Sequence, residues 1–481
     1  MSLRLTLTAL ALASTVAVPL SAQAAPSLTL SEAIATAQRN NLSVAASEAK
    51  ITQAKRQIDQ TYAGLYPQLT LTSSAINYNI IDSNALIMGG LGGLGGAGGM
   101  GGMGGMGGMG MGGLSGAAGM GGSFGLIQNS VSVSQVLFDG FQTASALKIA
   151  DASVKMSEVD RGNQLRKSAY DTAKGYLQVL KATSLREVAL RSLEQAQAHV
   201  EAARIKERAG TGTRFEVLQA EAQLANIQGQ LRSATNNVEL ARLSLGTTMG
   251  EPVGDRRLAS EIALPRLDVA MNLDLQTAIE NRPEYQTLVL KRRIDEATVD
   301  LNRKANLPKA QAQAQYSQQG LGTGRNFMLM AGLSWTVLDW GKADAKVSSS
   351  ELDLAQTDFN LESARRNLSM DVQSSLLSRQ DARDRVAISQ KGLQVSQESY
   401  RMAQVRYNAG VGTGYEVIDA QTQLVQAQNN YVQATYDLQS AEVGLAQALG
   451  VDLSAAVNSA AQPKSSLELT KNSPELIKKG N

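Results

Sequence analysis

The chain has 481 residues, of which 43% are apolar and 18% charged, and its formal net charge is +2. At roughly 150 residues per domain, this length suits about three domains or one large repetitive domain. The small net charge leaves no electrostatic footprint for nucleic acid, so no nucleic-acid partner is expected. The chain has no cysteine and a single histidine, His199, which excludes thiolate nucleophiles, disulfides and metal centres built from Cys or His. The composition therefore predicts no catalytic residues of the familiar kinds, no metal and no cofactor.

Residues 1–25 have the pattern of a secretory signal peptide. One early charge, Arg4, precedes an apolar run, and within 21–25 small residues stand at the positions that signal peptidase reads, with cleavage expected near Ala24 or Ala25. A buried N-terminal helix is the alternative. The rest of the chain has no second apolar run of the length that a membrane helix needs. A part of the mature chain that enters a membrane must therefore do so as strands.

The mature chain is a tandem duplication. A shift of 200 positions overlays its two halves without a gap over more than a hundred residues. Phe138-Asp139 meets Leu338-Asp339, and the Gly-X-Gly-Thr run at 210–213 meets the run at 410–413. We expect one repeat over 26–270, a second over 271–455, and a poorly ordered tail over 456–481.

Each repeat predicts a helix, two strands, a long helix and a shorter helix. In the first, we expect a helix over 30–64 with Ser31 as N-cap, strands over 68–82 and 124–138, and helices over 143–209 and 213–249. In the second, we expect a helix over 273–305, strands over 309–319 and 326–338, and helices over 342–409 and 413–449. The sequence thus predicts a mainly helical protein with four strands.

The strands alternate polar and apolar side chains, and the shorter helices carry a heptad. Phe327, Leu329 and Leu333 share one face of a predicted strand. This alternation suits a membrane β-barrel and, equally, a half-buried soluble sheet. Large residues recur every seven positions from Val217 and from Val417, opposed by small ones, which indicates a coiled-coil seam.

Four strands cannot close a barrel in lipid. Membrane barrels need at least about eight strands, because an open sheet edge leaves backbone groups unpaired. Two or three copies would have to combine, and strand counting does not choose between them.

Over nearly the whole mature length, the chain resembles the TolC family of outer-membrane efflux and secretion channels. The features that carry this resemblance are the duplication, the runs at 137–140 and 338–341, the Gly-X-Gly-Thr tips and the run at 415–420. It implies a homotrimer in the outer membrane of a Gram-negative bacterium, with a 12-stranded β-barrel that continues into a periplasmic α-helical coiled-coil barrel. It further implies a passive exit duct of a tripartite efflux pump or type I secretion system, opened at its periplasmic tip by an adaptor and an inner-membrane transporter. A periplasmic coiled-coil scaffold or adaptor is the alternative, and the cargo stays open.

The two hairpin tips are the predicted functional sites. Thr213 and Thr413 are candidate N-caps, with Glu216 and Glu416 placed to complete capping boxes, so turn chemistry alone is one interpretation. The resemblance implies a periplasmic gate, in which Glu216, Glu416 and Asp419 face the lumen and Tyr407 belongs to a closing network whose usual basic residue is replaced by Gly412. It also implies adaptor docking at the tips, made by Gly210, Gly212, Thr213, Gly410, Gly412 and Thr413.

An insert rich in glycine and methionine separates the first two predicted strands. Residues 83–123 contain nearly half of the chain's 44 glycines and no charged residue. A flexible loop at the outer mouth of the barrel is the simpler interpretation. Binding of Cu(I) by the methionine thioethers is the alternative.

Overall fold

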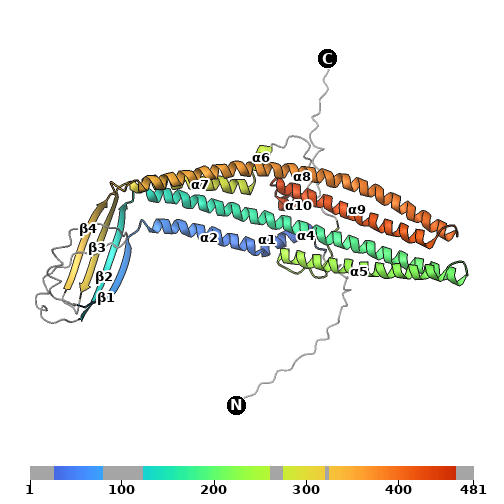
Figure 1. The fold of residues 1–481 in the computed structure, drawn as a ribbon. Coiled ribbons are helices and arrows are strands. Elements are labelled where there is room, and N and C mark those ends of the chain that lie inside the picture. The colour runs from blue at the N-terminus through green and yellow to red at the C-terminus, as the bar shows by residue number, and fades with distance from the viewer. Residues whose placement is uncertain (1–26, 80–122, 261–274, 320–323, 462–481) are drawn as a thin grey trace, which may run out of the picture. The chain divides into compact units, whose positions relative to one another are not determined.

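A computed structural model describes residues 27–79, 123–260, 275–319 and 324–461 (Figure 1). The predicted signal peptide lies outside these residues, and so does all of the predicted insert except Ser123. The chain divides into two compact units. The helical unit comprises Met1–Thr52, Val154–Lys291 and Thr357–Asn481, and the sheet unit comprises Gln53–Ser153 and Arg292–Gln356.

The sheet unit holds four antiparallel strands in the order β1-β2-β3-β4. They are β1 (Gln68–Asn79), β2 (Ser123–Phe138), β3 (Lys309–Gln319) and β4 (Gly324–Ser334). The four predicted strands are confirmed, but β4 ends before 338. Ser334 pairs with Lys309, the first residue of β3, and Pro308 before it has no N–H to offer. Residues beyond Ser334 therefore have no partner strand on that side.

One face of this sheet is apolar across all four strands. Leu71 lies opposite Val131, Val131 opposite Tyr316, and Tyr316 opposite Phe327. In the adjacent row, which faces the other side, Thr70, Ser132 and Gln315 are polar, and the row ends at Met328 on β4. Leu71 is 75% exposed and Phe327 is 72% exposed, so a single copy leaves the apolar face uncovered.

The helices follow the predicted order with two additional breaks. They are α1 (Leu30–Asn40), α2 (Leu42–Ala63), α4 (Gln142–Arg208), α5 (Arg214–Met249), α6 (Leu275–Glu280), α7 (Pro283–Arg303), the 3-10 turn η1 (Lys304–Asn306), α8 (Lys342–Asn408), α9 (Gly414–Ala448) and α10 (Leu453–Ala461). The first six residues of the segment 456–481 thus belong to a helix, and the remainder lies outside the described residues.

Both breaks divide a helix that the sequence predicts to be continuous. Asn41 has extended backbone, accepts from the Ser43 amide at 2.8 Å, and donates to the Ser168 hydroxyl at 3.2 Å. The predicted helix over 273–305 is interrupted at Arg282, because a residue before proline is driven out of helical geometry. The first helix begins at Leu30 as expected, but its N-cap is Thr29, two residues before the expected Ser31, and Thr29 forms a complete capping box with Glu32.

The main core of the helical unit holds together the two ends of the first repeat. The Tyr176 side chain is fully buried, and its hydroxyl lies 2.8 Å from the carbonyl oxygens of Leu28 and Ala259. Burial raises the pKa of Tyr176 to about 12, so this hydroxyl keeps its proton. The predicted heptad positions Val217 and Val417 are buried as well, which confirms the seam.

Equivalent turns lead into the two long helices. Gly140 and Phe141 both have positive φ, and so do Trp340 and Gly341. In the second turn, the amides of Ala343 and Gly341 donate to the carboxylate of Asp339 and lower its pKa. Asp339 therefore caps α8.

Candidate functional site

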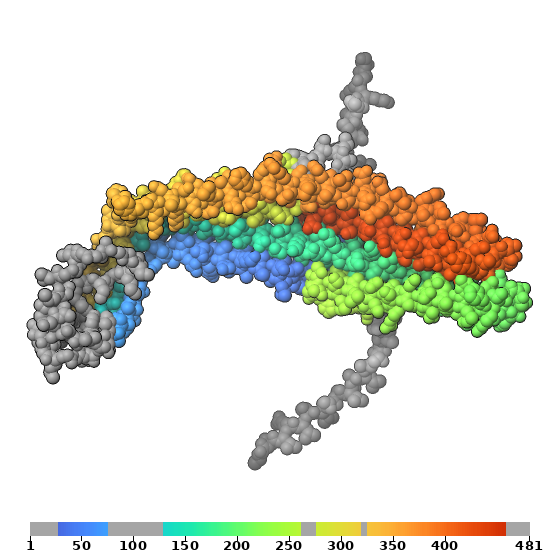
Figure 2. Space-filling view, viewed as in Figure 1, coloured from blue at the N-terminus to red at the C-terminus, as the bar shows by residue number. Residues whose placement is uncertain are grey.

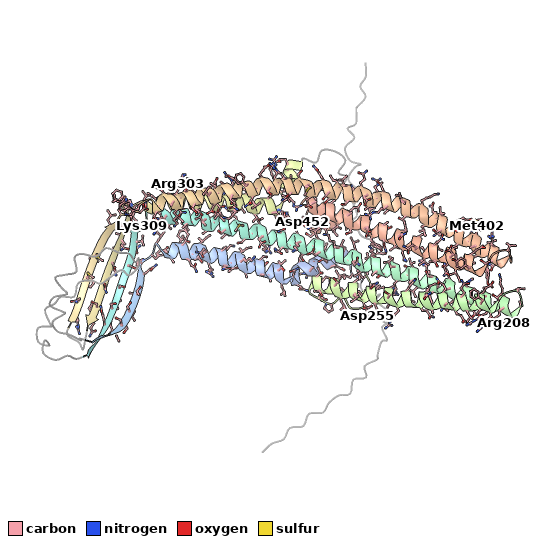
Figure 3. The ribbon with its side chains drawn as sticks, viewed as in Figure 1. Arg208, Asp255, Arg303, Lys309, Met402 and Asp452 are labelled. Atoms are coloured by element: carbon pink, nitrogen blue, oxygen red, sulfur yellow. The ribbon has the colours of Figure 1, made fainter. Side chains whose placement is uncertain are left out.

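The two hairpin tips repeat one backbone geometry. Gly210 has φ of 73° and Gly410 has φ of 77°, the left-handed conformation that ends α4 and α8. A Cβ at Gly212 would lie 3.0 Å from Cβ of Lys206, and one at Gly412 would lie 3.0 Å from the amide nitrogen of Tyr407. A side chain at 412 would therefore crowd the backbone of the preceding turn of α8, and glycine avoids this contact. Arg208 marks the end of α4 at the first tip in Figure 3.

The threonines cap the helices that leave the tips. The hydroxyls of Thr213 and Thr413 accept from the amides of Glu216 and Glu416, both at 3.3 Å. At these two described tips, the return bond from the threonine amide to the glutamate carboxylate does not form, so the predicted capping boxes are only half present. The two carboxylates are available for other contacts.

Tyr407 joins the two tips of one copy. The Lys206 Nζ lies 3.3 Å from the centroid of the Tyr407 ring and donates a hydrogen bond to the Tyr407 carbonyl oxygen. The His199 ring packs against the Tyr407 ring, and the two ring centroids are 5.4 Å apart. Lys206 and His199 belong to α4, whereas Tyr407 belongs to α8, so these contacts connect the two hairpins.

Gly414 leaves the space into which three side chains converge. A Cβ at this position would lie 3.7 Å from Tyr407 Cε2, 3.8 Å from Glu216 Cγ and 3.9 Å from His199 Nε2. The Tyr407 hydroxyl is buried and has no hydrogen-bond partner in the described part of the chain. Burial raises the pKa of Tyr407, and the nearby Glu216 carboxylate raises it further. Burial lowers the pKa of His199, against the influence of Glu216, so the cluster favours a neutral imidazole.

The other two predicted carboxylates, Glu416 and Asp419, do not contact the group around Tyr407. Arg406 Nε is 3.5 Å from the Glu416 carboxylate, so Glu416 is held within its own hairpin. Asp419 accepts from the Gln423 side chain at 2.9 Å on the exposed side of α9. Of the four predicted gate residues, the structure thus brings only Glu216 and Tyr407 together.

Sequence reasoning missed the contribution of Lys206 and His199. Lys206 precedes Tyr407 by 201 positions, so the shift of 200 that relates the repeats places the two residues nearly level. The shift between the repeats is therefore the one sequence feature that places Lys206 near Tyr407. His199 is the chain's single histidine, and nothing in its neighbourhood along the sequence points to Tyr407.

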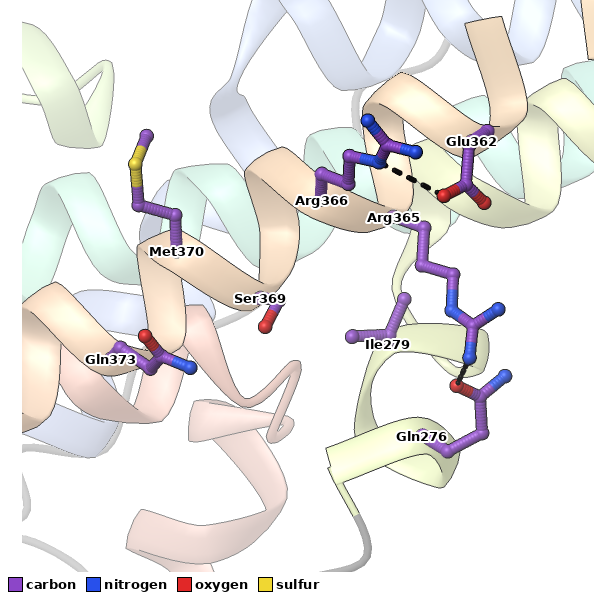
Figure 4. A pocket seen from close by; sticks show the side chains of 8 residues that line it. All are labelled: Gln276, Ile279, Glu362, Arg365, Arg366, Ser369, Met370 and Gln373. Carbon is purple, nitrogen blue, oxygen red and sulfur yellow. Dashed lines mark hydrogen bonds and ion pairs between the residues drawn. The ribbon is translucent and has the colours of Figure 1, made fainter. Parts of the chain in front are cut away.

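Away from the tips, a shallow hollow lies on α8 beside α6 (Figure 4). Its guanidinium groups are already bound within the chain. Arg365 donates to Gln276 at 2.6 Å, and Arg366 donates to Glu362 at 2.9 Å. We assign no ligand to this hollow.

The sequence profile of the outer membrane efflux proteins matches residues 33–251 and 275–451. The chain belongs to this family. The two matched segments fall one in each predicted repeat, and the family is one of channel proteins. Membership decides in favour of an outer-membrane efflux channel and against the periplasmic scaffold.

Individual relatives agree with this assignment. The outer membrane efflux protein BepC of Brucella suis is 24% identical over 66% of this chain and 71% of its own length. The pyoverdine export outer membrane protein OpmQ of Pseudomonas aeruginosa is 27% identical over 64% of this chain and 66% of its own length. The crystal structure of CusC superposes with a TM-score of 0.72 at 16% identity, covering 88% of this chain and 92% of CusC.

The described helices include none that is both long and apolar enough to cross a membrane.

Proposed function

We propose that three copies of this chain form the passive exit duct of a tripartite efflux pump or of a type I secretion system. A 12-stranded β-barrel would lie in outer-membrane lipid and continue into a periplasmic helical tube. A periplasmic adaptor and an inner-membrane transporter would deliver the cargo and open the tip. In this role the chain catalyses no reaction and needs no cofactor, so the energy for transport comes from the transporter.

The observation that carries this proposal is the sheet. Its apolar face is uncovered, and its outermost strands, β1 and β4, each have one edge without a partner among the described strands. An unpaired edge is unstable in lipid, because water is absent and the backbone groups cannot be satisfied. Pairing β4 of one copy with β1 of the next removes every edge once the ring closes. The choice of three copies comes from the family resemblance.

We further propose that the tips form the gate of the duct. The contacts of Lys206 and His199 with Tyr407 tie the two hairpins of one copy together, which supports a closed tip. Glu216 borders this cluster, and Glu416 and Asp419 would add carboxylates to the mouth. The exposed turns around Gly210, Gly212, Thr213, Gly410, Gly412 and Thr413 would receive the adaptor.

Neutralising Glu416 and Asp419 tests the gate. The variant Glu416→Gln with Asp419→Asn keeps side-chain size and removes two charges per copy. A ring of carboxylates favours cations, so we expect the variant to show a clearly reduced cation preference. Reversal potentials of single channels in a KCl gradient across a planar bilayer measure this preference.

The matched control removes the same charge far from the tip, through Asp353→Asn with Asp384→Asn on α8. The control should keep the wild-type reversal potential. An equal loss in both variants, or no loss in either, would remove Glu416 and Asp419 from the mouth of the channel.

A further inference from the structure

The chain's single histidine is buried where the two hairpin tips meet. Figure 2 shows the ends of the two hairpins, green and red, lying against each other. His199 belongs to α4 of the first hairpin and is 9% exposed. Its ring packs against Tyr407 of α8, and its Nε2 lies 3.9 Å from the position that a Cβ at Gly414 of α9 would occupy. One imidazole of the first hairpin thus faces both helices of the second.

The groups that face His199 come from all four helices of the tips. Lys206 follows it by about two turns on α4, and Glu216 approaches from α5. Tyr407 comes from α8, and α9 presents the backbone of Gly414. Burial lowers the pKa of His199, Glu216 opposes this effect, and Lys206 adds to it. The imidazole therefore lies between one negative and one positive charge.

Other charged side chains near the tips are paired with one another. These ion pairs are Arg204 with Glu221 at 2.8 Å, Arg214 with Glu207 at 3.7 Å and Arg406 with Glu416 at 3.5 Å. The pair on the second hairpin keeps the Glu416 carboxylate away from the histidine. Lys206 and Glu216 are thus the two charges that act on the imidazole.

A neutral imidazole fits these surroundings better than a charged one. When the ring is neutral, one of its nitrogens can accept a hydrogen bond, and the buried Tyr407 hydroxyl is a donor that has no partner within the described residues. When the ring is protonated, both nitrogens are donors, close to the ammonium group of Lys206. The Tyr407 ring already holds the Lys206 Nζ at 3.3 Å from its centroid, so an imidazolium would compete for the same ring.

The attraction that protonation creates lies within one hairpin. His199 and Glu216 both belong to the first hairpin, so an ion pair between them adds nothing to the contact with the second. Lys206 makes that contact, through the ring and the carbonyl oxygen of Tyr407. A second positive charge about two turns before Lys206 on the same helix repels it. Protonation therefore strengthens a contact inside one hairpin and weakens the contact between the two.

We propose that His199 is a proton switch of the tip: its neutral form keeps the two hairpins together, and its protonated form releases them by displacing Lys206 from Tyr407. This inference rests on the proposed gate at the tips and adds a stimulus, acid, that acts on it.

The direction of the pH effect follows from the burial of His199. The joined tips bury the ring and lower its pKa, whereas released tips expose it and return its pKa to about 6.5. The released form therefore binds the proton more tightly than the joined form does. Lowering the pH below about 6.5 favours release, and raising the pH above this value favours the joined tips.

The pH dependence of single-channel conductance in planar bilayers tests the switch. The ratio of the conductance at about pH 5.5 to that at about pH 7.5 reports His199, because the chain has no other histidine and exposed carboxylates, with a pKa of about 4, stay ionised throughout. We expect a ratio of severalfold for the wild type. His199→Gln, which keeps a neutral polar side chain, should bring the ratio close to one.

Two further variants complete this test. The matched control, His199→Gln with Gln390→His, moves the single histidine to an exposed position on α8, and its ratio should also be close to one. His199→Lys places a permanent positive charge at the tip, so its conductance at about pH 7.5 should already be raised severalfold. Wild-type conductance in His199→Lys at this pH would contradict the switch.

Lys206→Met separates a failure of the switch from a failure of the gate, because it removes the contact with Tyr407 at every pH. Suppose that Lys206→Met raises the conductance. A wild-type ratio of one, or a wild-type ratio retained in His199→Gln, would then overturn the switch and leave the gate intact. If neither Lys206→Met nor acid changes the conductance, the contact between the hairpins does not close the tip, and both proposals are overturned.

Discussion

Lys206→Met is expected to open the closed tip and raise the single-channel conductance severalfold. Methionine keeps the apolar stem of lysine but removes both the cation above the Tyr407 ring and the donor to the Tyr407 carbonyl oxygen. A cation–π contact contributes about 0.5–2 kcal/mol, and a hydrogen bond from a charged donor contributes about 1.5–3 kcal/mol. In a trimer this loss occurs three times around one narrow mouth. Conductance in planar bilayers is the measurement.

The neighbouring residues supply the controls for this prediction. Lys167→Met removes the same charge from an exposed position on α4 distant from the tip, and it should conduct as the wild type does. Lys206→Arg keeps a cation near Tyr407 and should retain most of the closure. Wild-type conductance in Lys206→Met would show that the contact between the hairpins does not hold the tip closed.

Arg282→Ala should strongly destabilise the helical unit. The Arg282 side chain is 9% exposed, and its Nη1 donates to the carbonyl oxygens of Gln447 at 3.2 Å and Ala448 at 2.8 Å. Its Nε donates to Glu284 at 3.1 Å. One guanidinium therefore joins the break before α7 to the end of α9. At about 1.5–3 kcal/mol for each hydrogen bond to a charged group, its removal should cost several kcal/mol.

Thermal unfolding of the purified protein in detergent measures this effect as a lower Tm. Arg282→Lys should recover only part of the loss, because a single ammonium cannot reproduce the planar fork of donors. Arg293→Ala, an exposed arginine on α7, serves as the matched control and should leave the Tm unchanged. A Tm for Arg282→Ala equal to that of the control would refute the role of Arg282 in joining these elements.

Features that repeat along the sequence were predictable, and features that depend on distant partners were not. The strands and the seam follow from alternation and heptad spacing, which are properties of neighbouring residues. The break at Asn41 depends on the Ser168 hydroxyl, 127 positions away. The surrounding sequence is otherwise typical of a helix, so no local pattern reveals this break.

The same distinction applies to the tips. The glycine turns and threonine caps are local and were expected from the sequence. The surroundings of Tyr407 come from Lys206 and His199 on another helix, and they become visible only when the hairpins are placed together.

The measurement that tests the central claim most directly is the native mass of the protein extracted from membranes in detergent, corrected for bound detergent. The account predicts a mass of three mature chains, recovered from the outer-membrane fraction, because three copies supply the strands that close the barrel. A monomer or dimer recovered from the soluble periplasm would contradict it, since the apolar face of the sheet would then never have met lipid.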